Sequence, residues 1–278
     1  MGGDLSNLDA AWELEQHLAG LPLGGLRYFS SIGSTNTEAS AWADAGAADL
    51  SLAVADEQTA GRGRGGRRWF TPPGAALAFS LVLRPGSAAP PADLLARYTA
   101  LGGLAVADAL QQAYGLPAQV KWPNDVLIER RKVCGVLTEA QWTGAQLSAL
   151  VLGIGVNVSP AAAPPPGELL YPAACVETAL GRPLGRWALL RAILDRLIEW
   201  RARLDSPQFW RAWDERLAFK GEWVQVADGL ARDGADAAAV QDALVLGLDE
   251  QGGLRLQDRQ GSAFTLTTGE LRLRPGDW

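Results

Sequence analysis

Apolar positions in the first four fifths of the chain alternate between helical and strand spacing. Leu5, Leu8, Trp12 and Leu18 recur near a 3.6-residue period, which predicts an amphipathic helix over residues 5–19. Helices are also expected over 35–44, 93–114, 173–180, 186–204 and 207–218. Shorter apolar runs predict strands over 27–29, 51–56, 76–83, 120–122, 126–129, 132–139 and 147–158. Thr35 followed by Glu38 fits a capping box at the start of the second helix.

The pattern changes from Gly221 onward, where only short strands are expected. They span residues 223–226, 244–248, 254–257, 264–267 and 271–273, with turn glycines between several of them. This pattern predicts a small C-terminal β-barrel as a second domain, so the expected boundaries are 1–219 and 220–278. Residues 160–167 are expected to form a loop, and Asp228 to Asp242 an insertion that lengthens the barrel.

Composition narrows the chemistry that the chain can perform. Of 278 residues, 48% are hydrophobic and 20% charged, which is typical of a globular protein. No apolar run reaches the ~18 residues that span a membrane, and no secretory signal is visible. The two cysteines, Cys134 and Cys175, and the single histidine, His17, disfavour disulfides, zinc sites and Ser-His-Asp chemistry. We therefore expect a cytoplasmic protein whose site uses Lys, Arg, Asp, Asn and backbone amides.

Positive charge is concentrated in one segment although the net charge is −6. Residues 61–68 read Gly-Arg-Gly-Arg-Gly-Gly-Arg-Arg and are followed by Trp69-Phe70. Glycines let the backbone bend sharply and approach a ligand closely, and guanidinium groups suit phosphate and carboxylate oxygens. One interpretation is a loop that closes over a small anionic ligand. The other is a solvated Arg/Gly tract that binds RNA.

Two further segments combine a lysine with a constrained backbone. Lys121-Trp122-Pro123-Asn124-Asp125 follows a predicted strand, and its lysine and amide can contact phosphate while Asp125 can hold Mg²⁺. An ordinary proline turn explains this segment equally well. In Lys132 to Glu139, alternation places Lys132, Cys134, Val136 and Thr138 on one strand face and Gly135, Leu137 and Glu139 on the other. Here the alternative is a core strand with a solvated lysine.

Glycines at alternate positions of Gly153-Ile154-Gly155-Val156-Asn157 clear one face of a buried strand. A planar ring system could lie against that face, with Asn157 offering a donor and an acceptor. A close contact between a helix and the strand would explain the same pattern. A dinucleotide-binding fingerprint fits poorly, because the third glycine and the following helix are missing.

Taken together, these segments resemble the biotin protein ligase family over about residues 27–219. The resemblance rests on Ser34-Thr35-Asn36, Gln58-Thr59-Ala60-Gly61-Arg62-Gly63-Arg64 through Trp69, Lys121 to Asp125 with Lys132 to Leu137, and Gly153 to Asn157. It implies an α+β fold, with a mixed sheet backed by helices like that of class II aminoacyl-tRNA synthetases and a small SH3-like C-terminal barrel. Gly65-Gly66 depart from the family's pattern, so the loop is expected to be floppier.

The resemblance implies a two-step reaction with biotin and ATP as substrates and Mg²⁺ as cofactor. Biotinyl-5′-AMP forms first, and a lysine of a biotin carboxyl carrier protein then takes the biotinyl group. Lys132 and Arg64 would be catalytic, at the reacting carboxylate and α-phosphate. Biotin would be bound by Ser34, Thr35, Asn36, Gln58, Gly61, Arg62, Gly63, Arg64, Lys132, Gly135, Leu137, Gly153 and Gly155. The nucleotide would be bound by Arg67, Arg68, Trp69, Lys121, Asn124 and Asn157, and Asp125 would contact Mg²⁺.

The resemblance also implies partners. Only 33 residues precede Ser34, too few for the winged-helix DNA-binding domain of some members, so no sequence-specific DNA binding is expected. No membrane association is expected either, because the chain lacks a long apolar run. A homodimer is compatible with the family. Two other functions stay open at this point: a lipoate-attaching enzyme of similar chemistry, and a non-catalytic RNA-binding protein that uses the Arg/Gly tract.

Overall fold

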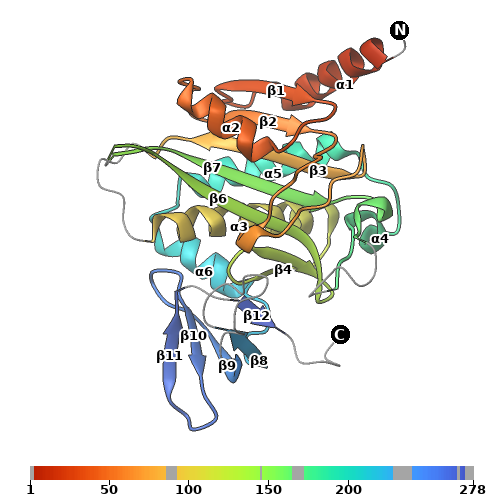
Figure 1. Ribbon diagram of the computed structural model, residues 1–278. Helices are drawn as coiled ribbons and strands as arrows, with labels where there is room; N and C mark the ends of the chain where they lie inside the picture. The colour runs from red at the N-terminus through yellow and green to blue at the C-terminus, as the bar shows by residue number, and fades with distance from the viewer. Residues whose placement is uncertain are drawn as a thin grey trace.

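The computed structural model describes residues 3–85, 93–144, 146–164, 172–227, 240–267 and 270–272. A mixed seven-stranded sheet with helices on both faces forms the larger part, and a smaller antiparallel sheet lies beyond one end of it (Figure 1). The expected α+β class, with a helix-backed mixed sheet and a small C-terminal β-structure, is confirmed. Within the described ranges, none of the helices combines the length and the apolar composition that crossing a bilayer requires.

The large sheet has the strand order β1-β2-β3-β7-β6-β5-β4. Its strands are β1 (Gly25–Phe29), β2 (Ser51–Ala55), β3 (Ala76–Leu83), β4 (Ala118–Lys121), β5 (Asp125–Ile128), β6 (Arg131–Thr143) and β7 (Gln146–Asn157). Only β1 and β2 run parallel, and the remaining neighbours are antiparallel. The long strands β6 and β7 lie at the centre, so the lysine of residue 132 and the glycines of residues 153 and 155 come side by side in one sheet.

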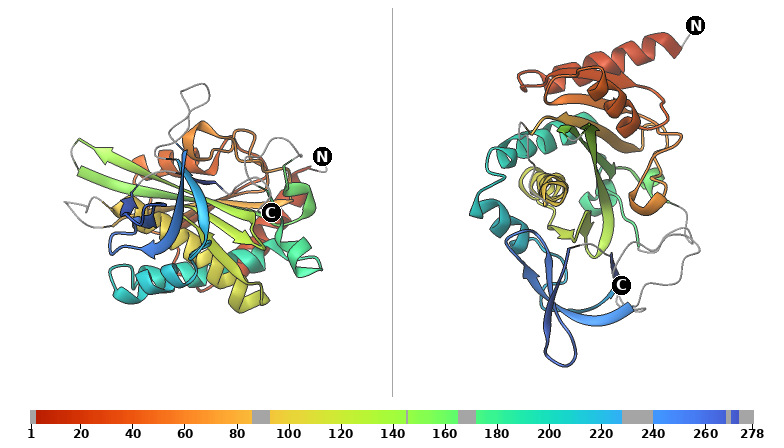
Figure 2. Two further views of the ribbon diagram at one scale, coloured as in Figure 1. Left: turned by 90° about the horizontal axis from the view of Figure 1, so that it is seen from below. Right: turned by 60° about the vertical axis from the view of Figure 1, so that its left-hand side comes forward.

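Helices cover the two faces of this sheet with different kinds of side chain. On one face, α3 (Leu94–Tyr114) packs beneath β6 and β7, with α5 (Arg186–Arg201), α6 (Pro207–Glu215) and α1 (Gly3–Leu18) around it (Figure 2). Large aliphatic side chains from alternate strand positions fill this layer. On the other face α2 (Thr35–Asp44) packs against β2 and β3 over small residues, mainly alanines. This thin layer brings the start of α2 close to the sheet.

The smaller sheet has the order β11-β10-β9-β8-β12, and all its pairs are antiparallel. Its strands are β8 (Trp223–Ala227), β9 (Val240–Leu248), β10 (Leu254–Gln257), β11 (Ala263–Leu266) and β12 (Glu270–Arg272). A direct link to the large sheet is the indole N–H of Trp122, which donates to the carbonyl of Gly252 at 3.0 Å. The domain boundary at 219/220 stays a prediction.

Several local expectations need correction. The capping box at Thr35 is wrong: Ser34 is the N-cap without a side-chain cap bond, and the Thr35 hydroxyl turns instead toward Gln58. Two predicted helices are too long at their C-terminal ends. The helix expected over 186–204 ends at Arg201 as α5, and the helix expected over 207–218 ends at Glu215 as α6. The helix expected from residue 173 begins at Val176 as α4 (Val176–Leu180). Within the expected loop 160–167, residues 160–162 form a short 3-10 helix, and residues 165–167 lie outside the described residues. Most of the insertion 228–242 also lies outside them.

Candidate active site

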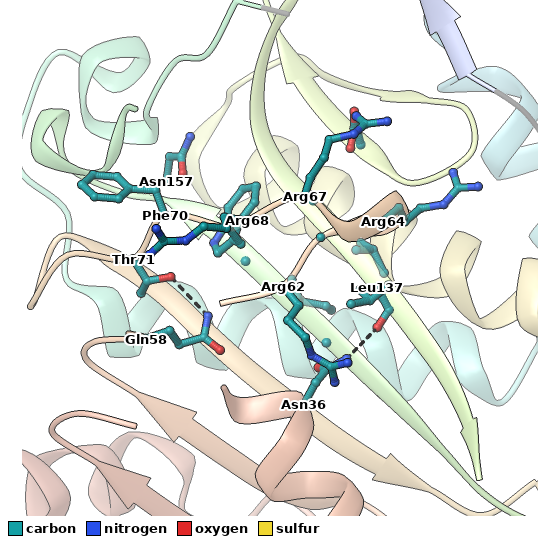
Figure 3. Close-up of a pocket in the computed structure, with 18 of the residues that line it drawn as sticks. Asn36, Gln58, Arg62, Arg64, Arg67, Arg68, Phe70, Thr71, Leu137 and Asn157 are labelled. Carbon is teal, nitrogen blue, oxygen red and sulfur yellow. Dashed lines mark hydrogen bonds between the residues drawn. The ribbon is translucent and has the colours of Figure 1, made fainter. Parts of the chain in front are cut away.

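A cleft of about 760 Å³ opens between the start of α2, the glycine-arginine loop (residues 61–68) and strands β4 to β7 (Figure 3). Every residue predicted to bind biotin, ATP or Mg²⁺ lines this cleft except Gly61. The lining residues among them are Ser34, Thr35, Asn36, Gln58, Arg62, Gly63, Arg64, Arg67, Arg68, Trp69, Lys121, Asn124, Asp125, Lys132, Gly135, Leu137, Gly153, Gly155 and Asn157. Segments more than 100 residues apart in sequence therefore share one cavity.

The start of α2 supplies a polar cradle at one end of the cleft. The backbone N–H of Thr35 donates to Gln58 Oε1 at 2.8 Å, and Gln58 Nε2 donates to Thr71 at 3.2 Å. Ser80 on β3 donates its one hydroxyl proton to Asn36 Oδ1 at 2.6 Å, and its oxygen lies 2.8 Å from Thr35 Oγ1. These side chains are held by one another, which gives the cradle a fixed pattern of donors and acceptors for a polar ring.

The glycine-arginine loop is a tight hairpin. Gly61 O accepts from Trp69 N at 2.9 Å, and Gly63 N donates to Arg67 O at 2.7 Å. At the tip, Gly65 and Gly66 have φ of 64° and 80°, a left-handed conformation that favours glycine. The departure at Gly65-Gly66 therefore has a geometric reason in the turn itself. Gly61 lies at the base, where a Cβ would overlap the carbonyl oxygen of Trp69, so it shapes the loop from outside the cleft.

Two arginines of the loop are tied inward to the sheet. Arg62 Nη2 lies 2.8 Å from Glu139 Oε2, and Arg64 Nη1 donates to Asn124 Oδ1 at 3.1 Å. Figure 3 shows Arg62 directed toward Asn36 and Leu137, whereas Arg68 lies on the side of Phe70 and Asn157. An extended RNA-binding tract would not be folded over a cavity in this way, and this geometry disfavours that alternative.

Lys132 points into the cleft for a reason that the alternation of strand residues did not reveal. Between β5 and β6 the register shifts, because Val126 pairs with Cys134 while Leu127 pairs with Lys132. Val133 is the extra residue of this β-bulge, and a bulge redirects the neighbouring side chain. The prediction that Lys132 shares a face with Cys134 is therefore wrong. Its Nζ lies instead where a Cβ on Gly135 would be 3.3 Å away.

The glycines of β7 make room for protein side chains. A Cβ on Gly153 would overlap Asn36 Oδ1, and a Cβ on Gly155 would overlap the indole of Trp69. The planar group against the cleared strand is thus Trp69, whose buried Nε1 has no hydrogen-bond partner among the described residues. Asn157, at the end of β7, donates to Ala174 O at 3.2 Å. The cleft floor is consequently an indole flanked by two side-chain amides.

Asp125 is a carboxylate that contacts two lysines of the cleft. Its Oδ1 is 2.6 Å from Lys132 Nζ and its Oδ2 is 3.5 Å from Lys121 Nζ. Burial alone would raise the pKa of this carboxyl, but the two lysines outweigh burial and hold the pKa below its ordinary value. Asp125 is therefore an anion whose two oxygens both face ammonium groups. Burial also raises the pKa of the nearby Cys134 thiol, which stays protonated.

The Mg²⁺ contact predicted at Asp125 fits this arrangement poorly. An ammonium group beside each carboxylate oxygen repels a divalent cation and competes with it for the carboxylate. In the part of the chain that the structure describes, no three His, Cys, Asp or Glu side chains gather where they could hold a metal ion. A magnesium ion held by protein side chains alone is not supported by these residues.

Glu139 and Ser80 do not line the cleft themselves, but they hold side chains that do, and the sequence pattern did not single them out. Glu139 accepts from Asn36 Nδ2 at 2.7 Å in addition to pairing with Arg62. The sequence does contain a pattern that could identify Glu139, because alternation places it on the same strand face as Gly135 and Leu137. Ser80 sits within a continuous apolar strand, where one small hydroxyl gives no pattern to recognise.

Comparison with known proteins places these features in one family. Residues 28–157 match the Biotin/lipoate A/B protein ligase family. The biotin–[acetyl-CoA-carboxylase] ligase of Paracoccus denitrificans is 36% identical over 236 residues, which cover 82% of this chain and 92% of that protein. The bifunctional ligase/repressor BirA of Bacillus subtilis is 34% identical over 192 residues, 69% of this chain; the match spans 57% of BirA's length.

A solved structure agrees with the sequence relatives. The biotin protein ligase from Aquifex aeolicus, in complex with biotin and ATP, superposes with a TM-score of 0.73 at 27% identity. The match covers 90% of this chain and 98% of that one. With the motifs of the cleft in place, the chain belongs to the biotin protein ligase family.

Proposed function

We propose that this chain activates biotin with ATP and transfers the biotinyl group to a lysine of a biotin carboxyl carrier protein. In the first step a biotin carboxylate oxygen bonds to the α-phosphorus of ATP, and the bond from that phosphorus to pyrophosphate breaks. In the second step the carrier amine bonds to the acyl carbon, loses a proton and releases AMP. The observation that carries the proposal is the shared cleft. It has the polar cradle at one end, and the same cavity is lined by a cation cluster made of Arg64, Arg67, Arg68 and Lys132.

The cation cluster suits the first step. Both reactants are anions, so bringing the carboxylate to the phosphate needs positive charge that is already in place. Arg64 is held by Asn124, and Lys132 by Asp125, within the same cavity. These two side chains would neutralise the carboxylate and α-phosphate oxygens, while Arg67 and Arg68, both exposed on the loop, would meet the outer phosphates.

The cradle at the other end suits the ureido ring of biotin. That ring carries two N–H donors and one carbonyl acceptor, and Ser34, Thr35 and Gln58 offer hydroxyl and amide groups that can match both kinds. Ser34 and Thr35 are 5% and 3% exposed, so a ring bound there would be largely shielded from water. The loop above would also protect an acyl-adenylate from hydrolysis. The nucleotide would then extend toward Asn124 and Asn157.

The partner under this proposal is the carrier protein. A homodimer, the absence of operator DNA binding and a cytoplasmic location remain predictions.

Mass spectrometry tests the proposal directly. The chain is incubated with biotin, ATP and Mg²⁺, and the expected product is biotinyl-5′-AMP together with pyrophosphate. Adding an apo carrier should then increase the carrier mass by one biotinyl group, with one AMP released. Lys132→Ala should reduce adenylate formation to a small residual rate. Lipoate in place of biotin is the control: if lipoyl-AMP forms faster than biotinyl-AMP, or neither forms, the proposal is wrong.

A further inference from the structure

Lysine is rare in this chain, and two of its three lysines meet at one point. Lysine and arginine together number 25, and the lysines are Lys121, Lys132 and Lys220 alone. Lys121 and Lys132 both contact Asp125, at 3.5 and 2.6 Å. An ammonium group is a compact point charge on a flexible stem, whereas a guanidinium is a broad planar fork. A chain that otherwise uses arginine thus places two ammonium groups against one carboxylate in the cleft.

The backbone brings these three groups together from three strands. Lys121 and Asp125 are a directly opposed pair of β4 and β5, and Asp125 is opposed to Gly135 on β6. The bulge at Val133 turns Lys132 to the same side. Backbone bonds from Lys132 N to Pro172 O at 2.8 Å and from Ala174 N to Lys132 O at 2.9 Å then fix its main chain. Only the lysine side chain remains to be held.

Asp125 supplies that restraint. Lys121 is 4% and Asp125 8% exposed, so the carboxylate offsets positive charge that is largely removed from water. On the opposite side, Lys132 Nζ lies 5.5 Å from the centre of the Trp69 ring. Removing the carboxylate would leave two ammonium groups close together with little solvent between them. Lys132 would then be expected to turn away from the cleft floor.

We propose that Asp125 is a positioning residue that holds the ammonium groups of Lys121 and Lys132 toward the anionic reactants, and that it is not a magnesium ligand. The carboxylate also neutralises part of the positive charge while no ligand is bound. The catalytic part of this inference rests on the proposed function; the positional part does not.

Amine labelling tests the positional part without any ligand. The chain is treated with acetic anhydride, and the extent of acetylation at each lysine is measured by peptide mass spectrometry. In Asp125→Asn, acetylation of Lys132 relative to Lys220 should rise at least threefold over the wild-type chain. Asp125→Glu, which keeps a carboxylate, should stay nearer the wild type. Asp49→Asn is the matched control, because Asp49 pairs with Arg201 outside the cleft. Unchanged Lys132 labelling in folded Asp125→Asn would overturn the proposal.

A double-mutant cycle tests the catalytic part. ATP–pyrophosphate exchange is measured for Asp125→Asn, Lys132→Ala and the combination, at several Mg²⁺ concentrations. If Asp125 acts through Lys132, Asp125→Asn should lower kcat at least tenfold, and it should cost little more once Lys132 is absent. Additive losses, or recovery of Asp125→Asn at high Mg²⁺, would refute the positioning role and indicate a metal contact. If the wild-type chain makes no acyl-adenylate, the proposed function fails, while the labelling result still decides what Asp125 does.

Discussion

A single methyl group at Gly153 should disrupt the polar cradle. A Cβ built there would overlap Asn36 Oδ1 and lie 2.7 Å from Asn36 Cγ. Asn36 cannot yield cheaply, because it accepts from Ser80 at 2.6 Å and donates to Glu139 at 2.7 Å. Gly153→Ala therefore forces either a shift of β7 or the loss of both hydrogen bonds.

The magnitude follows from these contacts. Forcing an extra methyl group into a packed site costs about 1–3 kcal/mol. The alternative, breaking one neutral and one charged hydrogen bond at a buried amide, costs about 1 and about 2 kcal/mol. The first route predicts a loss of about 1–3 kcal/mol in the free energy of unfolding and the second a loss of about 3 kcal/mol. Since the cradle is proposed to bind biotin, the affinity of the variant for biotin should also fall, by at least tenfold.

Urea unfolding measures the stability and titration calorimetry the biotin affinity. Gly33→Ala is the matched control, since a Cβ there would have no neighbour within 4 Å. Asn36→Ala should relieve the overlap, so adding Gly153→Ala to it should cost little. Wild-type stability and affinity in Gly153→Ala, or full additivity with Asn36→Ala, would show that the overlap is not what makes glycine necessary here.

Two further predictions concern the loop and the junction between the sheets. Glu139→Gln should speed trypsin cleavage after Arg62 several-fold, because it removes the ion pair that holds Arg62. The unfolding temperature should change little, since a partly exposed ion pair is worth below about 1 kcal/mol. Glu38→Gln breaks the similar Arg27 pair outside the cleft and should leave cleavage unchanged. Gly252→Val should destabilise the chain by about 2 kcal/mol more than Gly261→Val. Both glycines have positive φ, but only a Cβ at 252 meets Trp210 and Trp213, at 2.8 Å; equal losses in thermal unfolding would contradict this.

The sequence was a good guide to the elements whose pattern is strongly periodic. The helix expected over 93–114 is observed as Leu94–Tyr114, because its apolar stripe is long and Gly115 ends it with φ of 69°. The ends of α5 and α6 were less predictable. Apolar residues continue past both helix ends, since Leu204 and Leu217 still pack into the core from the connecting turns. The spacing of apolar residues indicates which residues are buried. It does not distinguish the last turn of a helix from a buried connecting segment that follows it.

The site was predictable as a set of residues, because the motifs are local in sequence and each contains groups that suit anions. What each side chain contacts was not. Glycine at 153 and 155 indicates that something occupies the strand face, but the occupant comes from residues 36 and 69. Such a partner is set by tertiary packing between distant segments, and a single sequence carries no direct record of it.

The orientation of Lys132 shows where this limit matters for chemistry. Strict alternation would direct the lysine away from the cleft, and one extra residue in β6 reverses it. A lysine on the far face could not approach Asp125 or the indole of Trp69, whatever its motif. The reactivity proposed for this site therefore depends on the bulge at Val133 as much as on the lysine, and a chain that kept every motif residue but lost the bulge should have the pocket without the chemistry.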